Sequence, residues 1–180
     1  NRLANFHRDN TDLSVLVVTV NQVYNEFSSG GQDITAIRDF AKLLYDDSDP
    51  GRELKYMLFF GDASYDYKNI LPDNTNYVPC WESISSLDIV SSIATDDYFG
   101  FLDDGEGQEF ANDLVDVGIG RFVVATEEES SASVDKTIHY SVNTTKVMAP
   151  WRNNVTFIAD DGDANRHLKD AEKLAAIFDS

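Results

Sequence analysis

A cluster of three carboxylates is the first feature of this sequence that suggests chemistry. Asp103, Asp104 and Glu106 lie within four residues of one another, and Asp96 and Asp97 come shortly before them. Sites made only of oxygen ligands suit hard cations such as calcium. We therefore predict a calcium site at Asp103, Asp104 and Glu106. The alternative, an exposed acidic hairpin without metal, stays open.

A second acidic segment begins at Asp161. Asp161, Asp163 and Asn165 alternate oxygen donors as at the start of a calcium-binding loop, and Glu172 stands at the twelfth position, where such a loop needs a bidentate carboxylate. Arg166 occupies the sixth position, where the sharp turn requires glycine. The alternative is that these acids cap the N-terminus of a helix.

Cys80 is the only cysteine, so the chain forms no internal disulfide and no thiolate-rich metal site. A catalytic thiol needs a neighbouring histidine that lowers its pKa, and the chain offers His7, His139 and His167. Cys80 instead lies in an acidic stretch, where negative charge raises the pKa of a thiol. We interpret it as a structural thiol that packs as a small apolar side chain.

The charge balance excludes several classes of partner. Fourteen Lys and Arg stand against 32 Asp and Glu, which gives a formal net charge of −18. Residues 69–120 contain eleven acidic residues and no Lys, Arg or His. Such a chain repels phosphate backbones and anionic membrane surfaces. It also lacks an apolar run of the roughly 20 residues that span a bilayer. We expect neither a nucleic-acid partner nor direct membrane insertion.

Alternating strand and helix patterns predict a parallel sheet. Leu13–Val20 is a β-branched apolar run typical of a buried strand. Apolar residues at spacings of three and four then predict a helix that is capped by Asp33 and ends before the turn Asp46–Gly51. Leu54–Phe60 predicts a second buried strand. Strand, helix and strand together predict a βαβ unit with parallel strands.

The remaining patterns predict a hairpin, two helices and one more strand. In chain order these are hairpin strands Tyr98–Leu102 and Leu114–Ile119, a helix from Thr126 to about Thr145, a strand Asn154–Ala159 and a helix from Ala164. Pro150 favours a break between the two helices. We therefore predict a first α/β subdomain over residues 1–148, and the first strand and helix of a second over 149–180. Because the chain starts without Met and stops directly after an apolar helical pattern, we expect a piece of a longer protein.

Six segments, taken in order, resemble the gingipain-type cysteine peptidases. They are Tyr56–Asp62, Thr95–Gly100, Asp116–Phe122, Lys136–Tyr140, Trp151 and Phe157–Asp160. In that family a strand ends in Gly-Asp, and a later Ile-Gly-Arg-Phe precedes a helix that carries Ile-His-Tyr. The segments cover nearly the whole chain. The segment Asp96–Asp104 is similar in form to the acidic hairpin of the surface sortases within this family.

The resemblance implies a caspase-like α/β fold with a parallel sheet in three αβα layers, of which this chain holds the N-terminal subdomain and the start of the second. It implies a cysteine peptidase of the sortase type, which cleaves the C-terminal sorting domains of type IX secretion cargo. Protein substrates and other surface components of that system are the implied partners. The implied location is secreted, or on the outer-membrane surface of a Bacteroidetes-type bacterium.

In this family the catalytic dyad is a histidine in a Gly-His-Gly turn and a later cysteine, both in the second subdomain. The sequence contains no Gly-His-Gly, and neither Cys80 nor His139 matches the dyad motifs. We assign no catalytic residue in this chain and expect the fragment alone to be inactive. A non-catalytic surface scaffold or binding module with the same fold is the alternative function.

The resemblance also bears on the two acidic segments. Asp161 and Asp163 occupy the loop that lies near the specificity pocket in this family, which suggests a substrate-binding role for them. The peptidase chemistry requires no cofactor. Structural calcium commonly accompanies the family, so the resemblance is compatible with the predicted site at Asp103, Asp104 and Glu106.

Overall fold

The structure is a computed structural model that describes the chain apart from residues 86–87, 89, 108–111, 143–146 and 179–180. The chain divides into two units, Asn1–Ile138 and His139–Ser180. The predicted subdomain boundary between residues 148 and 149 stays a prediction. None of the helices in the described part of the chain has both the length and the apolar character that crossing a membrane requires.

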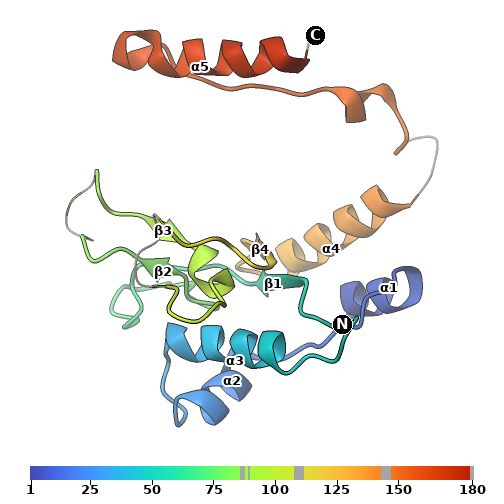
Figure 1. Cartoon of the computed structure of the whole chain (residues 1–180), viewed down its shortest axis with the longest axis vertical. Coiled ribbons are helices and arrows are strands. Elements are labelled where there is room, and N and C mark those ends of the chain that lie inside the picture. Colours follow the sequence, from blue (N-terminus) through green and yellow to red (C-terminus); the bar gives the residue numbers. More distant parts are fainter. Residues whose placement is uncertain (86–87, 89, 108–111, 143–146, 179–180) are drawn as a thin grey trace. The chain divides into compact units, whose positions relative to one another are not determined.

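In the first unit three helices come first, and short strands and a 3-10 helix follow before the last helix (Figure 1). They are α1 (Arg2–Asn10), α2 (Val20–Phe27), α3 (Ile34–Asp46), β1 (Tyr56–Phe60), β2 (Trp81–Glu82), β3 (Ala94–Thr95), the 3-10 helix η1 (Asp97–Gly100), β4 (Gly118–Phe122) and α4 (Glu127–Ser141), whose last turn belongs to the second unit. The second unit continues with the 3-10 helix η2 (Pro150–Asn153) and α5 (Gly162–Phe178).

A pair of parallel strands forms the centre of the first unit. β1 pairs with β4 along its whole length, from Tyr56 opposite Gly118 to Phe60 opposite Phe122. Parallel neighbours need a long crossover between them, and here the chain between β1 and β4 contains β2, β3 and η1. The predicted strand over Leu54–Phe60 forms at Tyr56–Phe60, but its predicted burial is wrong, because Tyr56, Leu58 and Phe60 are exposed and only Phe59 is buried. The predicted parallel sheet is confirmed, with β4 as the partner of β1.

Helices α2 and α3 cover one face of this strand pair (Figure 1). Phe59 of β1 meets Phe99 of η1 edge to face with ring centroids 4.8 Å apart, and Phe99 is fully buried. The helices contribute the buried side chains Val23, Tyr24, Ala36 and Ile37 to the same cluster. Burying a large apolar side chain stabilises a fold by about 1.5–3 kcal/mol, so this cluster sets how the helices pack on the sheet.

Side-chain caps define where α3 and α4 begin. The carboxylate of Asp33 accepts a hydrogen bond from the N–H of Thr35 at 2.8 Å, as the sequence predicts. At the start of α4, the Thr126 hydroxyl accepts from the N–H of Glu129, and the Glu129 carboxylate accepts from the N–H of Thr126. This reciprocal pair confirms the predicted start of α4. Its predicted end near Thr145 lies outside the described residues.

The predicted strand Leu13–Val20 is wrong. Residues 12–19 have no regular secondary structure, and Leu16 and Val17 are 63% and 53% exposed. Val20 instead begins α2, because Thr19 and Gln22 form a capping box in which each side chain accepts a hydrogen bond from the other's main-chain N–H. This local cap starts a helix despite the strand propensity of the apolar run.

The predicted hairpin around the acidic turn is also wrong. Tyr98–Gly100 belongs to η1, and Gly118 begins a strand that pairs with β1. The two segments still meet, because the carboxylate of Asp116 accepts hydrogen bonds from the N–H groups of Leu102 at 2.7 Å and Asp103 at 3.2 Å. This carboxylate and one main-chain hydrogen bond, from the N–H of Asp116 to the carbonyl oxygen of Gly100 at 2.8 Å, take the place of strand pairing, which alternation of residue types does not reveal.

The predicted strand Asn154–Ala159 in the second unit is not formed. These residues have no regular structure, and no second strand pairs with them in the described part of this unit. The predicted helix that follows is confirmed as α5. Its first turn contains Asp163, Ala164 and Asn165 with φ of 48°, 57° and 59°, so the right-handed helix begins only after them. Left-handed backbone costs roughly 1–2 kcal/mol per residue outside glycine.

Candidate functional site

Arg121 of β4 forms hydrogen bonds with several loops at the carboxyl end of the two parallel strands. Its Nε and Nη2 donate to the two carboxylate oxygens of Asp96 at 2.8 and 2.7 Å. The two side chains are only 10% and 19% exposed. This is a bidentate ion pair in a largely buried setting, the geometry in which arginine and a carboxylate bind most strongly.

Three main-chain carbonyl oxygens accept the other N–H groups of the Arg121 guanidinium. Nη1 donates to Gly61 at 2.9 Å and Val78 at 2.7 Å, and Nη2 donates to Pro79 at 3.3 Å. The guanidinium also lies 5.2 Å from the centre of the Phe59 ring. All the donors of the guanidinium are therefore used, which offsets the cost of taking its charge out of water.

Residues 62–78 form a closed loop after β1, which we call the tyrosine loop because it carries Tyr65, Tyr67 and Tyr77. Its ends meet where the carbonyl oxygen of Asp62 accepts the N–H groups of Tyr77 at 3.1 Å and Val78 at 3.0 Å. Gly61 makes this closure possible. It has φ of +152°, and a Cβ there would lie 3.1 Å from side-chain atoms of both Tyr77 and Val78.

Asp66 orders the interior of the tyrosine loop. Its side chain is buried, and its carboxylate accepts the N–H of Leu71 at 2.6 Å. Hydrogen bonds from the main-chain N–H groups of Ile70 and Leu71 hold the pKa of Asp66 below its usual value. The Asn74 side chain donates to the Asp66 carbonyl oxygen at 2.7 Å. An ionised Asp66 carboxylate thus orders the interior of the loop, and the Asp62 carboxylate, which accepts the Thr75 hydroxyl at 2.6 Å, adds to it.

Cys80 follows the tyrosine loop and is half-buried. Burial raises the pKa of its thiol, the negative charge of Glu82 raises it further, and Arg121 opposes them only in part. A thiol with a raised pKa stays protonated at neutral pH and is a poor nucleophile. The geometry therefore supports the interpretation of Cys80 as a structural thiol.

The three histidines lie on three different helices. His7 is on α1, where its ring meets Phe6 edge to face with centroids 5.6 Å apart. His139 is in the last turn of α4, where a cation is favoured by the helix dipole. His167 is on α5 with its Nε2 3.5 Å from a carboxylate oxygen of Asp163.

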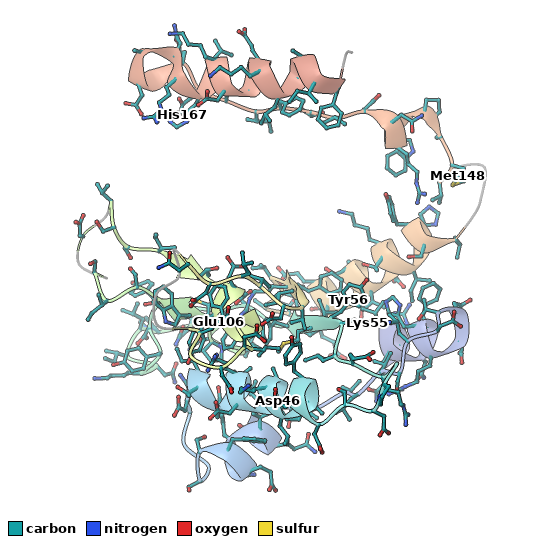
Figure 2. The ribbon with its side chains drawn as sticks, in the orientation of Figure 1. Asp46, Lys55, Tyr56, Glu106, Met148 and His167 are labelled. Carbon is teal, nitrogen blue, oxygen red and sulfur yellow. The ribbon has the colours of Figure 1, made fainter. Side chains whose placement is uncertain are left out.

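The acids of the predicted calcium site lie in the loop before β4, where Figure 2 labels Glu106. Asp104 pairs with Lys42 of α3 at 3.0 Å, the Tyr45 hydroxyl lies 3.5 Å from Asp103, and Glu106 accepts the N–H of Asp103 at 3.2 Å. Within the described ranges, no group of three His, Cys, Asp or Glu side chains is arranged to hold a metal. Calcium binding at these carboxylates stays a prediction.

Asp161 and Asp163 lie at the start of α5 in the second unit. Both are exposed, and Asp163 is one of the residues in the left-handed turn. The neighbouring Asp160 carboxylate accepts the N–H of Gly162 at 3.1 Å. A substrate-binding role for Asp161 and Asp163 stays a prediction.

Sequence reasoning missed the pair formed by Arg121 and Asp96. The two residues are 25 positions apart, and the sequence groups Asp96 with the acids of the predicted calcium site. The available signal was that Arg121 is the first basic residue after the base-free stretch 69–120. A single arginine that directly follows a long acidic stretch is a candidate for a buried ion pair with one of those acids.

Parallel strands with helices packed on them define the class of the chain as an α/β protein. The sequence model of Peptidase family C25 matches residues 1–180. The chain therefore belongs to this family, the gingipain family, as its ordered segments predict. Its fold is the gingipain, caspase-like α/β fold that the resemblance implies.

A solved structure supports the same assignment. The chain is similar to the crystal structure of dimeric latent PorU from Porphyromonas gingivalis, with 34% sequence identity and a TM-score of 0.64. The match covers 93% of this chain and 16% of the PorU chain. A search among curated proteins gave no match.

The substitution Asp66→Asn tests the role of the buried carboxylate. Because the pKa of Asp66 is lowered in the folded chain, its ionised form stabilises the fold above the unfolded pKa of about 3.9, and this contribution is lost as pH falls below that value. We expect Asp66→Asn to lower the Tm at pH 7 and to flatten the fall of Tm between about pH 5 and pH 3. Thermal melts followed by circular dichroism measure both.

Asp73→Asn is the matched control, since Asp73 is exposed in the same loop and has a φ of 56° that asparagine tolerates. It should leave Tm and its pH dependence close to those of the unchanged chain. Equal effects of the two substitutions would contradict the role given to Asp66.

A calcium titration tests the predicted metal site. Bound calcium stabilises the folded state by mass action. If the predicted site exists, added calcium should therefore raise the Tm. The variant Asp103→Asn/Asp104→Asn should lose that rise. A Tm that calcium leaves unchanged in the original chain would contradict the prediction and leave the loop as an acidic surface.

Proposed function

We propose that this chain is the N-terminal portion of the catalytic region of a gingipain-like cysteine peptidase that works as a sortase. The observation that carries the proposal is the match to Peptidase family C25 over residues 1–180, together with 34% identity to PorU. In the proposed enzyme the Cys-His dyad lies downstream of residue 180. The protonated state of Cys80 supports a nucleophile elsewhere.

The proposed reaction is acyl transfer through a thioester. The downstream cysteine thiolate attacks the carbonyl carbon of the peptide bond before the C-terminal sorting domain of a secreted cargo protein. The C–N bond breaks, the histidine protonates the departing amine, and the acyl group stays on sulfur. Water or an amine at the cell surface then attacks the thioester and regenerates the thiol. The first outcome is hydrolysis and the second is transpeptidation.

Within this enzyme the first unit acts as a scaffold. The Arg121–Asp96 pair fixes the carboxyl ends of β1 and β4, which is the edge of an open parallel sheet where ligands usually bind. The side chains that perform the chemistry then approach from the downstream part of the protein. We propose that Asp161 and Asp163 contribute to the substrate pocket of that downstream part.

The proposed location is the outer-membrane surface or the secreted fraction of a type IX secreting bacterium. Similarity to PorU supports this, and the proposed partners are cargo proteins and other surface components of the same system. The charge of −18 is compatible with such partners, because protein substrates do not require the basic surface that nucleic acids need.

Cleavage of a reporter that ends in a C-terminal sorting domain tests the proposed function. We expect no cleavage by the chain of residues 1–180. We expect cleavage by the longer encoded protein and a loss of about 10³-fold or more when its downstream dyad cysteine is changed to alanine. Product formation is measured by mass spectrometry, which also separates hydrolysis from amine transfer.

Cys80→Ala in the longer protein is the matched control and should keep activity within about twofold, because a structural thiol takes no part in the reaction. Activity of residues 1–180 that disappears with Cys80→Ala would overturn the proposal. A downstream sequence with neither Gly-His-Gly nor a later cysteine would favour the non-catalytic scaffold instead.

A further inference from the structure

The second unit contains a pocket beside the 3-10 helix η2. Its volume is about 330 Å³, and it is lined by Met148, which Figure 2 labels, and by Ala149, Pro150, Arg152 and Asn153. Pockets for small ligands have volumes of roughly 300–1,000 Å³ and combine an apolar lining with a few polar groups that orient the ligand. Three apolar residues beside one guanidinium and one amide match that combination.

Arg152 is held in place by contacts with the end of α4 and with η2 itself. Its guanidinium lies 4.0 Å from the centre of the Tyr140 ring and 5.8 Å from that of the Trp151 ring, both within the range of a cation–π interaction. Nη2 donates to the main-chain carbonyl oxygen of Tyr140, and Nη1 lies 3.5 Å from the sulfur of Met148. A side chain that is fixed in advance loses little freedom on binding, which favours affinity.

The guanidinium of Arg152 still lacks acceptors. Its Nε is buried and has no hydrogen-bond partner among the described residues. In the described part of the chain, Arg152 also forms no ion pair with Asp or Glu, and the thioether of Met148 is only a weak acceptor. Arg121, in contrast, has an acceptor for every donor. A buried charged donor without an acceptor is costly, so an anionic group in the adjoining pocket would be favoured there.

The charge of the surrounding sequence also favours an anion. Residues 136–159 contain Lys136, Lys146 and Arg152 but no Asp or Glu, although the whole chain has a net charge of −18. Positive charge that is concentrated in one segment attracts anionic ligands to it. Arg152 is the one charged residue that lines the pocket, which suits a ligand with a single negative charge. A carboxylate has that charge, and its two oxygens match the planar fork of a guanidinium.

We propose that this pocket binds a carboxylate group that is attached to an apolar body. The carboxylate accepts hydrogen bonds from Arg152 and from the side-chain amide of Asn153, and the apolar body contacts Met148 and Pro150. A small free acid and the C-terminal residue of a peptide both carry such a group. This inference goes beyond the proposed peptidase function and does not depend on it, because binding requires no catalytic dyad.

A titration of residues 1–180 with N-acetyl-leucine tests this pocket. Heteronuclear NMR follows the Nε–H of Arg152 and the indole N–H of Trp151, and we expect saturable shifts of both signals. The Kd should be on the order of 1 mM, as suits a ligand of this size. N-acetyl-leucine amide has the same body without the charge and should bind at least about tenfold more weakly.

An acetylated tripeptide that ends in leucine with a free carboxylate separates the two sources of the group. Tighter binding of the tripeptide than of N-acetyl-leucine would assign the pocket to a peptide C-terminus. Equal or weaker binding of the tripeptide would assign the pocket to a small free acid.

Two substitutions of Arg152 and one control connect binding to this side chain. Arg152→Gln should weaken binding of N-acetyl-leucine about tenfold or more, and Arg152→Lys should restore only part of it, because lysine offers a point charge in place of the planar fork. Arg166→Gln is the matched control, since it removes the same charge from an exposed position on α5. It should keep the Kd within about twofold. Circular dichroism checks that each variant is folded.

Several results would overturn the proposal. They are the absence of shifts, equal binding of N-acetyl-leucine and its amide, tighter binding of inorganic phosphate than of N-acetyl-leucine, and equal losses in Arg152→Gln and Arg166→Gln. The comparison of acid with amide uses the unchanged chain, so it decides the question even if a variant of Arg152 does not fold.

Discussion

The buried ion pair of Arg121 and Asp96 is the interaction on which the rest of the first unit depends. A buried charge is costly unless its hydrogen-bonding capacity is filled, and here the guanidinium uses every donor on one carboxylate and three carbonyl oxygens. Those acceptors are Asp96 before η1, Gly61 directly after β1, Val78 at the end of the tyrosine loop and Pro79 directly after it. One side chain on β4 thereby connects segments that secondary structure alone leaves separate.

This connection explains how the described loops between β1 and β4 are held in place without regular secondary structure. In the described residues between β1 and β4, regular structure is limited to the short pairing of β2 with β3 and the brief helix η1, so regular hydrogen bonding supplies little stability there. Hydrogen bonds to carboxylates stabilise this region in its place. Asp66 orders the tyrosine loop, Asp116 joins the two segments that the sequence predicts as a hairpin, and Asp96 pairs with Arg121. Part of the excess acidity that first excluded nucleic acid is therefore structural.

The sequence correctly predicted those elements whose start or end depends on neighbouring residues, such as helix caps. Asp33 and Thr126 cap helices at the expected positions, and the apolar run before Gly61 forms strand β1, although only Phe59 of this strand is buried. The connection of the two segments predicted as a hairpin could not be read from alternation, because the Asp116 carboxylate and one main-chain hydrogen bond join them in place of a strand ladder. The Arg121–Asp96 pair was missed because it joins residues 25 positions apart. The six ordered segments nevertheless identified the family, and one of them, Asp116–Phe122, contains Arg121.

Hydrogen exchange at the main-chain amides of Tyr77, Val78 and Phe99 tests the central role of Arg121 most directly. Removing one partner of a buried ion pair costs about 3 kcal/mol, equivalent to about 100-fold in local opening. We predict that Arg121→Met speeds exchange at these amides by about that factor. Arg2→Met, which breaks the exposed pair of Arg2 with Asp135, should change it by less than about fivefold. Unchanged exchange in Arg121→Met would contradict the account.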